Sequence, residues 1–545
     1  MKKLLNKIFY LLATGALAVV LPSCNDFLNK MPDNRATVDT QDKIQKMLVS
    51  AYPTTSYCVI AELSSDNTDD IEGVNNPNYT RFYSELFNWI PSTQTDYFGE
   101  APNFFWASCY KAISSANQAL QAIDQSPDTA NLSAEKAEAL LCRAYSHFVL
   151  VNMFCQHYDK KFAGTDLGIP YMEKSETTLN PKYERGTVAD VYQKIDRDIQ
   201  AALPDISDAY YKAPKYHFNM QAAYAFVARF YLYYENFDKA IEYATKALGA
   251  IPQNTMRDND ALHAIPMNPY NNVQLAYVNA SEKANFLLMS YYSGLGLTYG
   301  VSGICARFNH PTILAKTESV ALPNPPWNGT YKVGPVVFNS SNINKILLPH
   351  FPNAFEYLDP VARIGYYHTV HAVFTAEETL LVRAEAYVLK NDFTNALNDM
   401  NIWVKSATNS TMDLRLDSIN AWVTQFNYYK PDAPTPRKEL HPGFSVQKGT
   451  QENMIQLLLF MRRYETLHTG LRWFDLKRYG IVVYRRLIKS GNVSLVYDNP
   501  LVVRDPRRAI QIPSQVIGAG LEGNPIEPTT QSDVYDPNNV VEAVQ

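Results

Sequence analysis

The chain of 545 residues is too long for one ordinary hydrophobic core and long enough for two or three. Hydrophobic residues make up 46% and charged residues 19%, a globular composition that excludes a disordered or fibrous protein. The net charge of −5 argues against a nucleic-acid-binding protein that depends on a basic face. Tyrosine is abundant: the 37 Tyr outnumber the 25 Phe and 6 Trp together, and such rings suit ligand surfaces as well as cores.

The start of the chain has the pattern of a lipoprotein signal peptide. Lys2, Lys3 and Lys7 form a basic region, and the apolar run after them is too short to span a bilayer, which needs roughly 20 residues. Residues 21–24, Leu-Pro-Ser-Cys, resemble a bacterial lipobox, so we expect cleavage before Cys24 and lipidation of that cysteine. The alternative is an ordinary secretory signal with an incidental cysteine. No later segment has 18 uninterrupted apolar residues, so we expect an exported protein tethered by acyl chains.

The remaining cysteines predict neither a disulfide framework nor a zinc site, because they are odd in number, widely spaced and lack a C-x-x-C pair. They are Cys58, Cys109, Cys142, Cys155 and Cys305. Three of them, Cys109, Cys142 and Cys155, lie on apolar helical faces and are interpreted as core residues. The alternative is one disulfide bond among these cysteines, because an exported protein lies in an oxidising compartment.

The middle of the chain is predicted to form paired helices. Residues 103–123 place apolar side chains at three- and four-residue steps, and Ser133 is expected to cap the next helix. Thr187 is expected to cap a third helix, and residues 219–234 and 237–248 form a further pair.

An internal repeat supports this arrangement. Residues 228–240 and 384–396, which are 156 positions apart, share small residues, then an aromatic residue, then an alanine in the second helix. The pattern resembles tetratricopeptide repeat units, which must stack to bury their faces. A generic helical hairpin is the alternative for each unit.

Two segments, 54–99 and 251–375, lack a sustained helical period and are rich in Pro, Asn, Gly and aromatic residues. Long irregular segments inside a compact protein are usually functional or disordered, and the aromatic content favours order. Because binding residues usually lie on loops carried by a rigid scaffold, we expect the ligand site in these two segments.

Several motifs are similar to those of one known protein family. Residues 24–32 match that family's mature start of Cys, an acidic residue, Phe-Leu and Pro, and residues 106–117 match its helix with Trp, Tyr, Ile and Asn. Residues 463–480 resemble its Arg-Trp-x-Asp-Leu-x-Arg signature, with Thr469 in place of the usual Glu. Residues 510–513 fit its late Ile-Pro, whereas the closing Asn-Pro is only partly echoed. Together these motifs resemble the SusD/RagB family of outer-membrane lipoproteins.

The resemblance implies a mainly α-helical fold of about four tetratricopeptide-type hairpins with long loop-rich, aromatic-rich insertions. It implies three parts: a signal peptide over 1–23, a SusD-like N-terminal region over 24–235, and a SusD/RagB C-terminal region over 236–545. The implied function is non-catalytic capture of oligosaccharides at the surface of a Bacteroidota outer membrane. The implied partner is a SusC-like TonB-dependent transporter. From the net charge and the spacing of the histidines we expect no nucleic-acid partner and no catalytic metal, and we expect no cofactor.

Candidate ligand residues follow from the chemistry of sugars, whose apolar C–H faces lie on aromatic rings and whose hydroxyls bond to polar side chains. Trp327 is the leading candidate, because residues 325–329 (Pro-Pro-Trp-Asn-Gly) predict a stiff turn that presents its ring. In the family that the chain resembles, ligand aromatics lie in the loop before the helix at 106–117 and in the irregular central region, so the resemblance implies the other aromatic candidates Tyr97, Phe98, Tyr291, Tyr292, Tyr299 and Tyr331. The polar candidates are Asn67, Asp69, Asp70 and Arg81. Trp106 is assigned to the core.

The signature motif is interpreted as structural rather than ligand-binding. Gly470 is expected to end one helix in the left-handed conformation. Arg472, Asp475 and Arg478 are three residues apart on the next helix and predict an ion-pair network. The pair at 377–378, Glu-Glu, is interpreted as a solvated helix cap and not as a catalytic pair.

Two rival functions stay open. An exported glycoside hydrolase would need two carboxylates about 5–10 Å apart, which the loop acids Asp66, Asp69 and Asp70 could supply, although no catalytic motif marks them. A relative that binds peptides or glycoproteins would use the same Tyr-rich loops. The ten His show no metal-binding spacing. Binding of a Ca²⁺ ion by the acidic residues near Asp69 is a further alternative.

Overall fold

The computed structural model describes residues 38–72, 80–93, 98–176, 181–340, 343–528 and 540–541. Cys24 and the predicted signal peptide lie outside these residues. Gln41–Gln545 form one compact unit. Within the described ranges, no helix is both long enough and apolar enough to cross a membrane.

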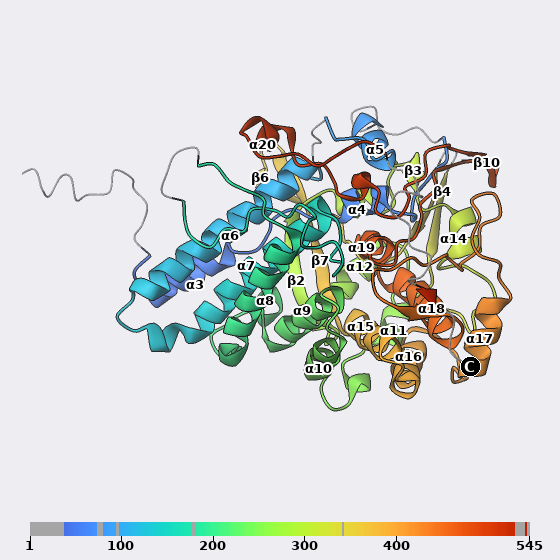
Figure 1. Ribbon diagram of the computed structural model, residues 1–545, viewed down its shortest axis with the longest axis horizontal. Helices are drawn as coiled ribbons and strands as arrows, with labels where there is room; N and C mark the ends of the chain where they lie inside the picture. Colours follow the sequence, from blue (N-terminus) through green and yellow to red (C-terminus); the bar gives the residue numbers. More distant parts are fainter. Residues whose placement is uncertain are drawn as a thin grey trace, which may run out of the picture. The chain divides into compact units, whose positions relative to one another are not determined.

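Long helices dominate the compact unit and pack in sequence-adjacent pairs (Figure 1). They are α3 (Gln41–Val49), α6 (Pro102–Gln125), α7 (Ser133–Phe154), α8 (Val188–Ala202), α9 (Met220–Tyr233), α10 (Phe237–Leu248), α15 (Ala376–Leu389), α16 (Phe393–Ala407), α17 (Leu416–Thr424), α18 (Thr450–Glu465) and α19 (Leu471–Arg478). Helix α6 packs on α7, α7 on α8, α9 on α10, α10 on α15, and α15 on both α16 and α18. The predicted helical-hairpin scaffold is confirmed.

Shorter elements connect and cover this scaffold. The short helices are α4 (Cys58–Ser64), α5 (Thr80–Phe87), α11 (Asn259–His263), α12 (Asn271–Tyr277), α13 (Leu295–Thr298), α14 (Thr312–Glu318) and α20 (Ser514–Gly518). Single 3₁₀ turns are η1 (Thr129–Leu132), η2 (Leu203–Asp205), η3 (Pro214–Tyr216), η4 (Pro252–Asn254) and η5 (Pro506–Arg508).

The strands form small sheets. They are β1 (Asp69–Asp70), β2 (Asn285–Tyr292), β3 (Phe308–Asn309), β4 (Val336–Ser340), β5 (Ile343–Leu347), β6 (Ala354–Asp359), β7 (Ile364–Thr375), β8 (Val446–Gln447), β9 (Arg486–Lys489), β10 (Asn492–Val496) and β11 (Val540–Val541). Their orders are β10-β9-β1-β3, β2-β7-β6, β4-β5 and β11-β8. The segment expected to be irregular, 251–375, therefore holds β2 to β7.

Local sequence explains where the helices begin. Thr187 caps α8 as predicted, because its hydroxyl accepts from the Asp190 backbone N–H while the Asp190 carboxylate accepts from the Thr187 N–H. Ser133 was expected to be an N-cap but is the first residue of α7, since the 3₁₀ turn η1 runs directly into that helix.

The predicted internal repeat has the same backbone geometry in both copies. The turn after α9 has a left-handed residue at Glu235 (φ 55°), and the turn after α15 has one at Asn391 (φ 61°), 156 residues later. The next residue closes each turn: Asn236 N–H donates to Tyr231 O, and Asp392 N–H donates to Tyr387 O, both at 2.9 Å. This six-to-one bond is the Schellman motif, so both helical hairpins use one turn design.

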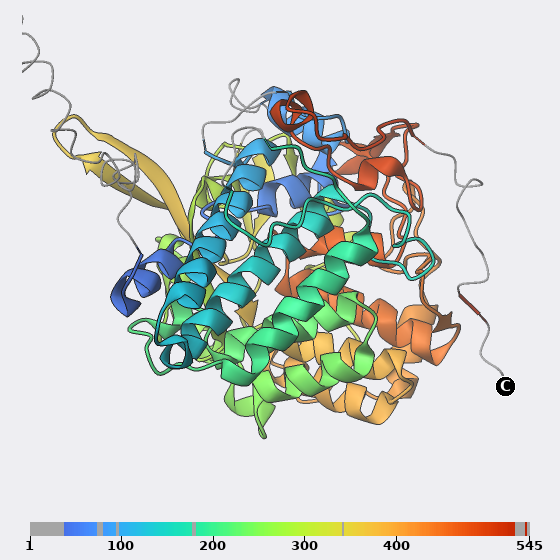
Figure 2. The same ribbon diagram turned by 60° about the vertical axis from the view of Figure 1, so that its left-hand side comes forward.

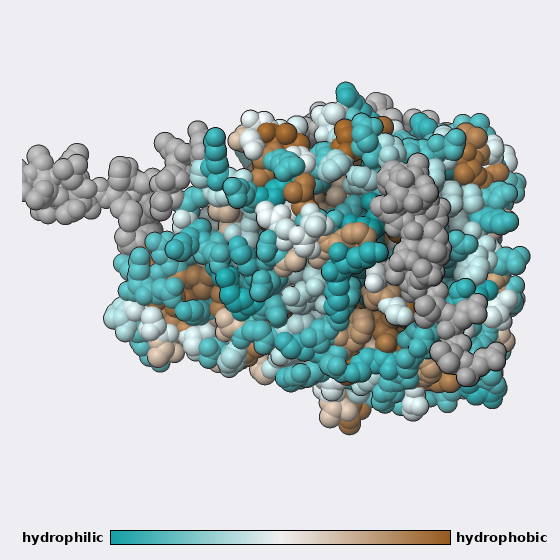
Figure 3. All heavy atoms as spheres, in the orientation of Figure 1, coloured by the Kyte–Doolittle hydropathy of each residue, from teal (hydrophilic) through white to brown (hydrophobic). Residues whose placement is uncertain are grey.

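The core is built from the inner faces of the helices. The predicted core residues Cys109, Cys142 and Cys155 are buried, and all five described cysteines are free. Most of the described face drawn in Figure 3 is hydrophilic, with hydrophobic residues in small separate groups.

The strands β6 and β7 form a ribbon that extends away from the helices (Figure 2). The far end of β7, Ala372 to Thr375, is buried beside β2. In contrast, residues 355–364 around the turn are all exposed, and Val361 is 96% exposed. One end of the β2-β7-β6 sheet is therefore fixed in the core while the other end is surrounded by solvent.

Candidate functional site

The acidic polar candidates are buried and bonded to arginines. Asp69 lies 2.6 Å from the Arg486 guanidinium, and Asp70 lies 2.7 Å from that of Arg307. Burial raises the pKa of Asp69 although the guanidinium of Arg486 opposes the shift. These carboxylates connect β1 to β9 and to the segment before β3, so they stabilise the fold instead of presenting a sugar site.

The other two polar candidates are also engaged within the protein. Asn67 is buried; its amide donates to Glu62 at 2.9 Å and its carbonyl oxygen accepts from Arg463 at 2.7 Å. Arg81 is exposed and pairs with Glu85 on its own helix, α5, at 2.9 Å.

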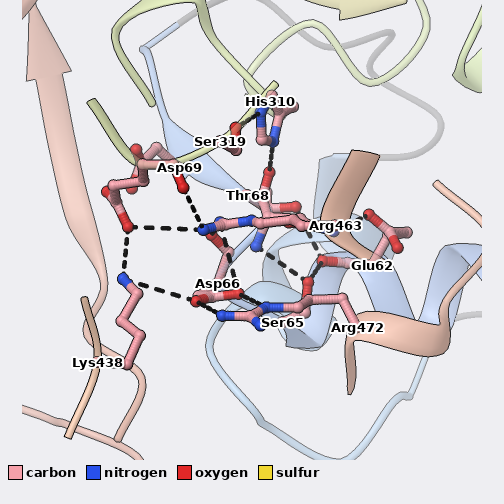
Figure 4. Close-up of polar contacts among 12 residues, drawn as sticks. Glu62, Ser65, Asp66, Thr68, Asp69, His310, Ser319, Lys438, Arg463 and Arg472 are labelled. Carbon is pink, nitrogen blue, oxygen red and sulfur yellow. Dashed lines mark hydrogen bonds and ion pairs between the residues drawn. The ribbon is translucent and has the colours of Figure 1, made fainter. Parts of the chain in front are cut away.

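Asp66 lies between three cationic side chains (Figure 4). Arg472 forms two bonds to it, at 2.8 and 2.7 Å, while Arg463 lies 3.5 Å and Lys438 3.8 Å away. Burial raises the pKa of Asp66, but the guanidinium groups of Arg463 and Arg472 outweigh burial and hold the pKa well below its usual range. The acids that a hydrolase would need are thus paired with arginines.

The signature motif forms the predicted ion-pair network, with more distant partners than expected. Gly470 has φ 83° before α19. Asp475 bonds to Arg462 at 2.9 Å and lies 3.5 Å from Arg478, as predicted, whereas Arg472 bonds to Asp66 and not to Asp475. The motif therefore fastens α19 to α18 and to the loop after α4.

The pair Glu377 and Glu378 lies in the first turn of α15, as predicted, but the interpretation as a solvated cap is wrong. Both side chains are buried: Glu378 bonds to Arg229 at 3.0 Å, and Glu377 accepts from the Arg257 backbone N–H at 2.6 Å. They face inward because buried cations of the neighbouring segments need anionic partners.

The leading aromatic candidate, Trp327, does not present its ring to solvent. It is 1% exposed, packs edge-on against Trp403 at 5.6 Å and contacts Phe460 at 6.1 Å. The expectation of an exposed ring is therefore wrong, because the turn folds the indole inward against α16 and α18. Trp106 is a core residue, as predicted.

Three tyrosine candidates also support the fold. Tyr291 and Tyr299 are buried, and Tyr299 stacks on His468 at 4.3 Å. Tyr331 stacks on Tyr464 at 3.8 Å with the rings nearly parallel. Tyr97 and the predicted lipidation site Cys24 lie outside the described residues.

The remaining two candidates, Phe98 and Tyr292, lie where the ribbon of β6 and β7 leaves the core. The ring centroids of Phe98 and of Tyr367 on β7 are 5.5 Å apart. The centroids of Tyr367 and Phe355 of β6 are 4.9 Å apart, and those of Phe355 and Tyr357 are also 4.9 Å apart. Phe98, Tyr367, Phe355 and Tyr357 thus form a continuous line of rings, which we call the aromatic row.

The strand register explains the aromatic row. Phe355 is paired directly with Tyr367, and Tyr357 follows two residues later on the same face of β6. Gly365 lies opposite Tyr357, and a Cβ atom there would meet Phe355 Cε1 at 2.8 Å, so the ring covers the glycine. Phe355 is 38% exposed and Tyr357 54% exposed, which leaves ring surface available to a ligand.

The base of the aromatic row is held by the turn after β2. The Phe98 ring lies against Gly294, where a Cβ would meet Phe98 Cγ at 2.6 Å. The buried carboxylate of Glu100 accepts from the Ser293 hydroxyl at 2.5 Å and from the Gly294 N–H at 2.8 Å. This support orders the end of the row before any ligand arrives.

The opposite face of the ribbon has a smaller aromatic pair. Tyr292, 43% exposed, contacts Tyr366 at 5.2 Å, and the Tyr366 hydroxyl donates to the Glu356 carboxylate at 2.9 Å. Rings, phenol hydroxyls and a carboxylate therefore lie together on an exposed ribbon. These groups provide apolar faces for sugar C–H groups and acceptors for sugar hydroxyls.

Sequence reasoning missed four of the residues at this site: Phe355, Tyr357, Tyr366 and Tyr367. The signal was the two-residue spacing of Phe355 and Tyr357 before a turn at 360–363, followed by Tyr366 and Tyr367 after it, which is typical of a β-hairpin.

A cavity of about 680 Å³ elsewhere in the protein is less suited to a sugar ring. It lies between η4, α11 and α16, and its described lining residues include no aromatic ring. Two cations in its wall are already paired, Lys332 with Asp260 at 2.8 Å and Lys405 with Asp413 at 2.7 Å. Across the described ranges, we find no group of three or more His, Cys, Asp or Glu that could hold a metal ion.

Comparisons with known proteins agree with this architecture. A SusD-like family model, described as "Starch-binding associating with outer membrane", matches residues 26–232. SusD-like protein P2 of Formosa agariphila is 24% identical over 409 residues, which is 69% of this chain and 71% of the relative. A putative sugar binding protein of Bacteroides vulgatus, 18% identical, superposes with a TM-score of 0.64 over 90% of this chain and 99% of that one.

A SusD superfamily protein of Bacteroides thetaiotaomicron, also 18% identical, has a TM-score of 0.61 and covers 89% of this chain and 99% of its own. These two structures share the helical fold, and the family model and the curated relative carry the same family name as the motifs at residues 24–32, 106–117 and 463–480. The chain is therefore similar to SusD-like proteins: its residues 26–232 match their family model, it resembles a SusD-like relative over 69% of its length, and it shares its helical fold with the two solved structures.

Proposed function

We propose that this protein captures oligosaccharides at the cell surface on its aromatic row and delivers them to a SusC-like TonB-dependent transporter. The single observation that carries the proposal is the row itself: four rings in contact, extending from Phe98 to the half-exposed Tyr357. Because the ribbon is exposed, a sugar can approach the rings on either of its faces. The helical scaffold keeps the base of the ribbon fixed.

Calorimetry with a panel of oligosaccharides tests the capture step. The chain from residue 25 to 545, which contains the whole compact unit, is titrated with malto-, xylo-, manno-, galacto- and fructo-oligosaccharides. For the sugar that binds, the double variant Phe355→Ala/Tyr357→Ala loses at least about tenfold in affinity, which corresponds to 1.4 kcal/mol.

The matched control is Val361→Ala, which removes an exposed apolar side chain from the same ribbon without removing a ring. It leaves the affinity within about twofold. Equal losses of affinity in the two variants would show that binding depends on the ribbon but not on its aromatic rings. Sugar released during the titration would favour the hydrolase.

Peptide capture is the second candidate, because β6 is an edge strand of the β2-β7-β6 sheet. An extended peptide adds to such an edge through main-chain hydrogen bonds. A tryptic digest of casein, titrated in the same way, tests this: heat from peptides but from no sugar would move the ligand class to peptides.

The membrane anchor proposed at Cys24 is tested by fractionation. Cys24→Ser in the full chain is expected to move the protein from the membrane fraction to the soluble exported fraction and to remove palmitate labelling. A labelled, membrane-bound variant would contradict lipidation at this residue.

A further inference from the structure

A second cavity, of about 520 Å³, lies where three segments of the scaffold meet. These are the loop after α7, the turn between α9 and α10, and the end of α15 at Lys390. Its walls include the rings of Tyr158, Tyr234 and Phe237, and it shares no residue with the aromatic row. The volume falls within the usual range for small-molecule sites, about 300–1,000 Å³.

Three aromatic rings and several polar groups line this turn cavity. Tyr158 contacts Tyr234 edge-on at 4.8 Å, which fixes the two rings relative to each other. Lys160 lies 3.5 Å from the Glu235 carboxylate, and Lys390 pairs with Asp238. The combination of ring faces with a carboxylate is the one that sugar recognition needs.

Glu235 is the unusual residue of the cavity. Its carboxyl is largely withdrawn from solvent, and burial raises its pKa to about 7 although Lys160 opposes the shift. Its backbone is in the left-handed region at φ 55°, where a glycine is the usual residue after a helix.

The internal repeat shows that the turn itself does not need a glutamate. At the equivalent position the second hairpin has Asn391, a residue type that tolerates the left-handed conformation and closes the same Schellman turn. Glu235 therefore carries a backbone cost that the folding of the turn does not explain, and it is one of the residues that line the cavity.

We propose that the turn cavity is a second saccharide-binding site, in which Glu235 accepts hydrogen bonds from sugar hydroxyls and an aromatic wall contacts the sugar ring. The ligand class rests on the proposed function, but the site is separate from the aromatic row. The competing explanation is a purely structural Glu235–Lys160 ion pair.

The test uses the 25–545 chain with Phe355→Ala/Tyr357→Ala, which removes the two exposed rings of the aromatic row. Saturation-transfer NMR is recorded with a pool of glucose, galactose, mannose, xylose and N-acetylglucosamine at millimolar concentration. We expect transfer to at least one sugar, and we expect Glu235→Gln to reduce it about tenfold, because the bond to a charged acceptor is lost.

Two glycine variants separate binding from folding. Glu235→Gly and Asn391→Gly both relieve a left-handed backbone, so neither lowers Tm, and only Glu235→Gly loses the sugar signal. If Glu235→Gln and Glu235→Gly keep the signal, or if no sugar of the pool receives transfer, the second site is overturned. In that case, oligosaccharide binding by the protein with an intact aromatic row would still support the proposed function. Conversely, a sugar signal that depends on Glu235, together with oligosaccharide binding that does not depend on Phe355 and Tyr357, would exclude the aromatic row and support the turn cavity.

Discussion

Aromatic side chains of this protein divide into two groups according to what surrounds them. Trp327 and Tyr299 are enclosed by other rings, whereas Tyr357 and Tyr292 have much of their surface in solvent. A ring in the first group contributes burial and packing to stability, and a ring in the second group has that free energy still available for a ligand.

Trp327→Ala is therefore expected to destabilise the fold by about 3–5 kcal/mol, because it leaves a cavity among Trp403 and Phe460. Tyr357→Ala is expected to change the free energy of unfolding by about 0.5 kcal/mol or less. Urea unfolding of both variants measures the difference. A folded, fully stable Trp327→Ala protein that no longer binds sugar would show that the ring contacts ligand.

At the scale of elements, buried ion pairs fasten loops to helices. The loop after α4 carries Asp66 and is held to α19 and α18 through Arg472 and Arg463 (Figure 4). Removing one partner of such a group leaves uncompensated buried charge, which costs far more than the loss of an exposed pair.

Asp66→Asn is expected to lower the free energy of unfolding by about 3–5 kcal/mol, because three cations lose their shared anion. Lys46→Ala, which breaks the exposed pair with Asp42, is the control and is expected to cost about 1 kcal/mol or less. Equal effects in urea unfolding would contradict the structural role of the network.

The same carboxyl makes a prediction about pH. The pKa of Asp66 is lower in the folded protein than its ordinary value of 3.8, so its stabilisation is complete above that value and is lost as pH falls through the folded pKa. The free energy of unfolding of the wild type is therefore expected to fall more steeply below pH 3.8 than that of Asp66→Asn. Equal slopes of the free energy of unfolding against pH in the two proteins below pH 3.8 would contradict this prediction.

At the scale of the whole molecule, sequence period and motif predicted the scaffold but not the site. Helices such as α8 were predictable because the cap Thr187 and the apolar spacing are local, and the echo at 156 residues predicted two matching turns. The location of the aromatic row was not predictable, because it needs Phe98 to meet Tyr367, 269 residues later, through the pairing of β2 with β7.

The errors have the same cause. A Pro-Pro-Trp turn predicts an exposed Trp327 ring, but whether the turn places the ring inward depends on α16 and α18, which come more than 60 residues later. Likewise Asp69 and Asp70 look like solvated loop acids until β9 and the segment before β3 bring arginines to them.

Oxidative footprinting of aromatic side chains, with and without a saturating bound oligosaccharide, tests the central claim most directly because it reports each ring separately. Binding on the aromatic row predicts protection of Phe98, Phe355, Tyr357 and Tyr367, with no change at the buried Trp327. If the oxidation of these four rings is unchanged while a sugar is bound, the aromatic row is not the binding site.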